Sequence, residues 1–81
     1  MLGKKKPSVG VAFGRVLREL RQERGLSQEA LALEADLQRN YISLIERGIN
    51  QPTITTIFKL AAALEVRPSE FIKLVEQPSA G

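Results

Sequence analysis

Residues 25–48 have the sequence GLSQEALALEADLQRNYISLIERG. Ser27 carries the side-chain oxygen of a good N-cap and predicts a helix over 28–35. Asp36 follows that helix, and a short aspartate tolerates the left-handed backbone geometry of a turn. A second helix is predicted over 38–47, before the glycine that closes the stretch. The stretch therefore predicts two short helices joined by about three residues.

The helix predicted over 38–47 has one apolar face and one polar face. On a helical wheel, Ile42 and Ile45 mark the face toward the core. The opposite face and its flanks carry mostly polar side chains and one leucine that points largely outward: Arg39, Asn40, Tyr41, Ser43, Leu44 and Arg47. Such a helix can present polar groups to a partner while its isoleucines hold it to the domain.

The segments on either side of this pair predict three more helices. Apolar residues recur at helical spacing over 9–24. A threonine cap opens a helix over 53–64, and an Arg-Pro pair opens another over 67–76, since proline fits the first helical turn. No segment has the alternating pattern of a strand. We expect an all-α bundle of five helices over 9–76, with a flexible basic arm at 1–8 and a disordered tail at 77–81.

The composition excludes several kinds of chemistry. The 81-residue chain has no cysteine and no histidine, which removes disulfides, thiolate metal sites and the commonest general base. Ser27 and Ser43 therefore lack the usual base of a nucleophilic serine. The sequence also has no glycine-rich phosphate loop. We expect no enzyme, no cofactor, no metal site and no small-molecule ligand.

The sequence also bears on the location of the protein. Its apolar stretches are far shorter than a bilayer span. The lysines near the N-terminus are followed by Pro7 and Ser8 instead of the apolar core of a signal peptide. We expect a cytoplasmic, nucleoid-associated protein without a membrane partner.

The positive charge is concentrated in the first third of the chain. The net charge is +3, but residues 1–24 hold seven basic side chains against two acidic ones, and the remainder holds five against seven. This distribution suits a polyanionic partner, although a basic surface without a partner is also common.

The quoted stretch closely resembles the helix-turn-helix of the lambdoid phage repressor and Cro family, the xenobiotic-response-element-type regulators. The resemblance continues through QPTITTIFKLAAALEVRPSEF at 51–71 and back through FGRVLRELRQERG at 13–25. The string YIS.IERG at 41–48 resembles restriction–modification controller proteins in particular. The resemblance implies a compact, repressor-like DNA-binding domain and a sequence-specific transcriptional regulator that binds double-stranded DNA, as a homodimer on a palindromic operator.

The resemblance also implies contacts to bases and to phosphates. The positions that match base contacts are Arg39, Asn40, Tyr41, Ser43 and Leu44. Arginine and asparagine can bond guanine and adenine bidentately, and a leucine can pack on thymine methyls. The alternatives are a solvated polar face and a tolerated surface leucine.

The phosphate contacts implied in the same way lie at the ends of the two helices and in the arm. They are Gln28, Gln38, Arg47 and Asn50, with Lys4, Lys5 and Lys6 in the arm. A side-chain amide beside the free N–H groups of a helix N-terminus can hold a phosphate. The alternatives are an ordinary polar N1 residue for Gln28, a favourable cation at a helix end for Arg47, and a solubilising tail for the lysines.

The sequence also predicts an ion pair within the domain and a dimer interface. In the family, the positions of Arg21 and Glu46 form a semi-buried ion pair between the first and third helices. Phe58, Ile72 and Val75 offer apolar surface at the C-terminal end and predict a dimer interface. Phe58 and Val75 could instead complete the small core. The quoted stretch departs from the family at Gln38, where a shorter polar residue would be a better N-cap.

Two other functions remain compatible with such a sequence. One is an antitoxin that blocks a toxin and binds DNA only secondarily. The other is a protein-interaction module that uses the same fold. The sequence does not distinguish a phage, a restriction–modification or a toxin–antitoxin circuit.

Overall fold

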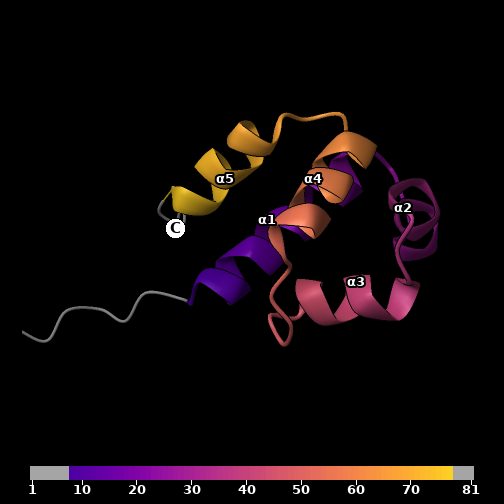
Figure 1. Ribbon diagram of the computed structural model, residues 1–81, viewed down its shortest axis with the longest axis horizontal. Helices are drawn as coiled ribbons and strands as arrows, with labels where there is room; N and C mark the ends of the chain where they lie inside the picture. The colour runs from indigo at the N-terminus through magenta and orange to yellow at the C-terminus, as the bar shows by residue number, and fades with distance from the viewer. Residues whose placement is uncertain (1–7, 78–81) are drawn as a thin grey trace, which may run out of the picture.

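Five α-helices account for the regular structure of residues 8–77, the part of the chain that the computed structural model describes (Figure 1). Their bounds are α1 Val9–Glu23, α2 Gln28–Ala35, α3 Arg39–Glu46, α4 Ile54–Ala63 and α5 Pro68–Glu76. These residues contain no strand. The predicted all-α, five-helix architecture is confirmed.

Side-chain caps explain where three of the helices begin. Ser8, Ser27 and Thr53 each accept a hydrogen bond from the backbone N–H three residues ahead, at 3.0–3.1 Å. Each cap satisfies one of the N–H groups that a helix start leaves without a partner. Ser8, which we predicted as the last residue of the arm, is therefore the N-cap of α1.

α2 has the predicted bounds, and each of the other four helices departs from its predicted bounds by one residue, at one end or both. Arg24 follows the end of α1 as its C-cap. Gln38 and Arg47, predicted as the first and last residues of the third helix, flank α3 as its N-cap and C-cap. Asp36 has φ 57° and ψ 50°, the left-handed geometry that its position in the turn predicted.

The core lies where the five helices converge. The largest fully buried side chains are Leu17, Leu31, Ile42, Ile45, Leu60, Leu64 and Phe71. The rings of Phe13 and Phe71 stack at a centroid distance of 4.5 Å and join α1 to α5. α1 also packs on α3, and α2 packs on both α3 and α4. This arrangement holds α3 between α1 and α2 at one edge of the domain (Figure 1).

Candidate nucleic-acid interface

The pair α2 and α3 forms a helix-turn-helix. Residues 36–38 separate the two helices. The backbone N–H of Leu37 donates to the carbonyl oxygen of Ala32 at 2.9 Å, which closes the end of α2. Ile42 and Ile45 have no exposed surface, so the inner face of α3 is fixed in the core. The outer face of α3 is free to meet a partner.

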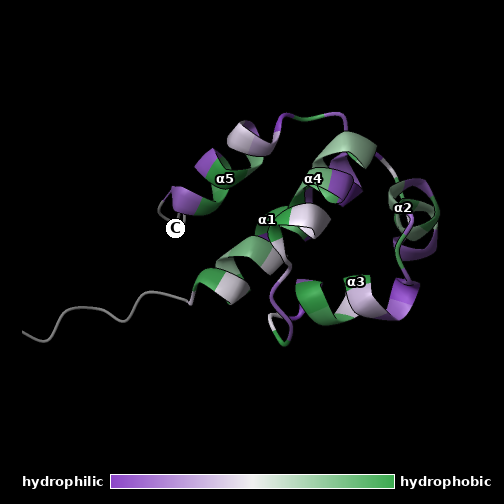
Figure 2. Ribbon diagram, in the orientation of Figure 1, coloured by the Kyte–Doolittle hydropathy of each residue, from purple (hydrophilic) through white to green (hydrophobic). Residues whose placement is uncertain are grey.

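The predicted base-contacting residues lie on or beside this outer face. Arg39 and Asn40 are exposed at the N-terminal end of α3, where the ribbon in Figure 2 has the purple of hydrophilic residues. Tyr41 and Ser43 are half-buried, and the Tyr41 ring packs partly against the core. Leu44 is half-buried too, whereas the wheel placed it largely outward. The structure thus brings the five together on one helix but exposes only the first two fully.

An ion pair joins the end of α3 to α1. Arg21 Nε donates to Glu46 Oε2 at 2.6 Å, and Arg21 Nη2 donates to Glu46 Oε1 at 3.0 Å. The two side chains are 12% and 4% exposed. The hydrogen bond to Glu46 raises the pKa of the Arg21 guanidinium above its ordinary value, although burial opposes this shift. Arg21 Nη1 also donates to the carbonyl oxygen of Leu26 at 2.8 Å.

Gln28 contributes a third element to the same cluster. Its side-chain Nε2 donates to Glu46 Oε1 at 3.0 Å, so Glu46 binds α1 and α2 at once. Gln28 was predicted as a phosphate contact, and one of its two amide N–H groups is used within the domain. Sequence reasoning missed this hydrogen bond because no spacing rule relates residues that are 18 positions apart.

The other predicted phosphate contacts surround α3. Gln38 and Arg47 are exposed at its two ends, and the Gln38 side chain makes no capping hydrogen bond. Asn50 is half-buried in the following loop, where its backbone N–H approaches the carbonyl oxygen of Leu44 at 3.3 Å. Lys4, Lys5 and Lys6 lie outside the described residues.

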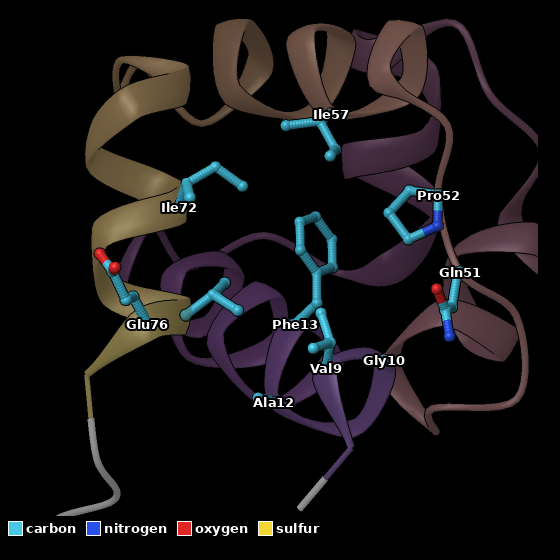
Figure 3. A pocket seen from close by; sticks show the side chains of 10 residues that line it. Val9, Gly10, Ala12, Phe13, Gln51, Pro52, Ile57, Ile72 and Glu76 are labelled. Atoms are coloured by element: carbon cyan, nitrogen blue, oxygen red, sulfur yellow. The ribbon is translucent and has the colours of Figure 1, made fainter.

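The predicted dimer residues lie on α4 and α5, away from α3. Phe58 is 57% exposed and Ile72 is 43% exposed, so Phe58 does not complete the core. Val75 is half-buried and packs against the core. Figure 3 shows Ile72, Ile57 and Val9 around an apolar groove beside this surface.

Residues 8–77 hold neither a metal-binding cluster nor a membrane-spanning helix. They contain no cluster of three or more acidic side chains that could hold a metal ion. None of their helices is long and apolar enough to cross a membrane.

The sequence and the fold match known regulators. The helix-turn-helix family pattern covers residues 17–71. Control protein C.BamHI of Bacillus amyloliquefaciens is 39% identical over 66 residues, which cover 80% of this chain and 82% of that protein.

Two solved structures of controller proteins are similar to most of the chain. The restriction-modification controller protein C.AhdI from Aeromonas hydrophila has 47% identity and a TM-score of 0.75, over 76% of this chain and 94% of that one. The controller protein C.Esp1396I, solved as a tetramer with its natural 35 base-pair operator, has 31% identity and a TM-score of 0.78, over 86% and 92%. The chain therefore belongs to the helix-turn-helix family of DNA-binding transcriptional regulators, of the Cro/C1 type, and is closely related to the restriction-modification controller proteins.

Proposed function

We propose that this chain recognises a specific operator by placing residues 38–47 in the major groove, and that it does so as a dimer on a palindromic site. The observation that carries the proposal is the division of α3 into two faces. Ile42 and Ile45 are fully buried, while Arg39 and Asn40 are exposed on the same short helix. A helix fixed by its inner face presents its outer groups at a defined position, as base recognition requires.

Each group on or near α3 has a distinct role in this proposal. Arg39 and Asn40 bond base edges bidentately, and Tyr41, Ser43 and Leu44 contact neighbouring bases. Gln38, Arg47, Asn50 and the second amide N–H of Gln28 bind backbone phosphates. Lys4, Lys5 and Lys6 add affinity by counterion release, which does not depend on base sequence.

The dimer supplies the second half of the site. A domain of this size covers one half-site, and two-fold dimers of helix-turn-helix proteins bind half-sites about 34–36 Å apart. The apolar surface of Phe58, Ile72 and Val75 is the proposed interface. The tetramer of C.Esp1396I on its operator supports assembly on DNA as a mode available to this fold.

Binding-site selection from random duplex DNA tests this function. The expected result is enrichment of one site with two-fold symmetry, which the protein binds far more tightly than a shuffled duplex at the same salt concentration. Binding without sequence preference would contradict recognition of an operator. Co-purification of a tight protein partner, together with weak DNA binding that hardly depends on salt, would instead favour an antitoxin or a protein-interaction module.

A further inference from the structure

Gly14 in α1 lies against the last turn of α3, backbone to backbone. A Cβ atom added at Gly14 would lie 2.3 Å from the carbonyl oxygen of Ile45 and 2.6 Å from that of Glu46. Cβ atoms in proteins essentially never come closer than 3.0 Å to such neighbours. The missing side chain at Gly14 therefore permits the close approach of α1 and α3.

The atoms that face Gly14 cannot turn aside. Both are main-chain carbonyl oxygens, and the turn that carries them is held on two sides. The Ile45 side chain is fully buried, and the Glu46 carboxylate binds α1 and α2 through Arg21 and Gln28. Any side chain at position 14 must therefore move this end of α3 relative to α1.

Gly10, one turn earlier in α1, provides the contrast. A Cβ atom there would lie 3.1 Å from Cγ of Gln51, part of an exposed and flexible side chain. Figure 3 shows Gly10 beside Gln51 at the rim of the groove. An alanine at position 10 therefore needs only a small shift of Gln51 and leaves α3 where it is.

The displacement expected from a side chain at position 14 is large for a recognition helix. Lengthening the contact from 2.3 Å to the 3.4 Å of ordinary van der Waals contact requires a movement of about 1 Å. Binding groups generally need to be held within about 0.5 Å of their productive position. α3 is only eight residues long and moves as one body, so the shift reaches Arg39 and Asn40 at its other end.

We propose that Gly14 is a positioning residue for DNA recognition, because the absence of a side chain there sets where α3 presents Arg39 and Asn40. This inference rests on the proposed function, in which α3 contacts bases. It assigns to α1 a role in specificity although Gly14 itself is buried and meets no DNA.

Gly14→Ala tests the proposal, with Gly10→Ala as its matched control, since both changes replace a glycine of α1 by alanine and lie one turn apart. Affinity is measured for the selected operator and for an unrelated duplex, at one salt concentration and with each variant folded. Gly14→Ala should lower the affinity for the operator by about tenfold or more, which is the loss expected from one bidentate base contact. It should lower the affinity for the unrelated duplex by less than about twofold. Gly10→Ala should stay within about twofold of the unchanged protein on both.

Amide chemical shifts of the free protein provide a readout that does not need DNA. Gly14→Ala should change the shifts throughout 39–46, whereas Gly10→Ala should change mainly those near Gln51. A folded Gly14→Ala protein that keeps its operator affinity, or that loses operator and unrelated DNA equally, would overturn the proposal. If the unchanged protein selects no site, the proposed function fails, and the shifts still decide whether Gly14 positions α3.

Loss of folding in Gly14→Ala is a separate outcome. The change is then repeated in a Glu65→Gly background, which should be more stable because glycine suits the left-handed backbone at position 65. Recovery of a cooperative unfolding transition allows the affinity comparison in that background. Continued failure to fold would show that Gly14 is required for folding, and the positioning role would be wrong.

Discussion

The Glu46 carboxylate joins α3 to two other helices. It accepts hydrogen bonds from Arg21 and Gln28, and the Glu46 side chain is 4% exposed. Glu46→Leu should lower the free energy of unfolding by about 3 kcal/mol or more, because it leaves the Arg21 guanidinium buried without its carboxylate. Urea unfolding followed by circular dichroism measures this loss.

The double change Arg21→Met with Glu46→Leu is the control for that measurement. It removes both charges, so it should recover much of the stability that the single change loses. Equal losses in the two proteins would show that the pair contributes no charge-specific stability.

The raised pKa of Arg21 means that its contribution to stability is fully present below the ordinary arginine pKa and is lost only as pH rises through the pKa of the folded state.

Glu65 is a residue held in a backbone conformation that its side chain disfavours. Its φ is 59°, in the left-handed region that costs an L-residue about 1–2 kcal/mol. Its exposed ion pair with Arg24, at 3.1 Å, contributes little. Glu65→Gly should therefore raise the free energy of unfolding by about 1 kcal/mol, measured by thermal unfolding.

The reverse change at Gly25 checks the same reasoning. Gly25 has φ 69°, and an added Cβ would meet nothing within 4 Å. Gly25→Ala should thus destabilise the protein by about 1 kcal/mol through backbone conformation alone. A neutral Gly25→Ala together with a neutral Glu65→Gly would show that these turns tolerate either residue.

α3 begins without a side-chain cap. Gln38 occupies the N-cap position, and its side chain makes no capping hydrogen bond. Gln38→Ser should raise the free energy of unfolding by about 0.5–1 kcal/mol, since a serine oxygen can accept the N–H of the first turn. Ser27→Gln, which removes a cap that is present, should have the opposite effect. An unchanged stability in Gln38→Ser would mean that water already satisfies this end of α3.

Arg39, at the exposed N-terminal end of α3, is expected to contribute to base specificity. Arg39→Ala should weaken operator binding by about 1–3 kcal/mol and relax the preference at one base pair. Arg67→Ala removes the same charge from an exposed arginine at the start of α5, so it controls for net charge. Fluorescence anisotropy on the selected operator and its single-base variants measures both. Equal losses in the two variants would reduce Arg39 to a nonspecific positive charge.

The elements could be predicted from sequence because their signals are local. Ser27 capping α2 and Asp36 ending it act within a few residues of the chain. The contacts that fix α3 could not be predicted in the same way. The Gln28–Glu46 hydrogen bond and the close approach at Gly14 depend on how α1, α2 and α3 pack. A glycine within a helical pattern does not indicate what lies against it, so Gly14 gave no signal.

The proposed DNA-binding face on α3 and the proposed dimer surface on α4 and α5 lie in different parts of the molecule. The resemblance to repressors and controller proteins is confirmed at the level of the family. The predicted base contacts, phosphate contacts and dimer residues remain predictions, because they concern partners that one chain does not contain. In Figure 1, α5 and the chain's last described residues lie across α1 from α3. A dimer formed through α4 and α5 would therefore leave α3 of each subunit free.

We expect the protein to form a dimer through the apolar surface of α4 and α5. Phe58 is 57% exposed on α4 and, in the proposed dimer, is buried against a second copy. Phe58→Glu should give a folded monomer in analytical ultracentrifugation at tens of micromolar, because it places a charge in an apolar interface. Leu33→Glu is the matched control, since Leu33 is even more exposed, at 78%, but lies on α2. It should leave the dimer intact.

Phe58→Glu also tests whether the two-fold symmetry of a dimer determines the two-fold symmetry of the DNA site. A monomeric Phe58→Glu protein keeps α3 unchanged, so it should still bind an isolated half-site as the unchanged protein's single domain does. It should lose the large gain in affinity that the second half-site provides, because that gain depends on linking two domains. If the unchanged protein is itself a monomer with and without operator, the palindromic site has no structural basis, and recognition must rest on α3 of one domain alone.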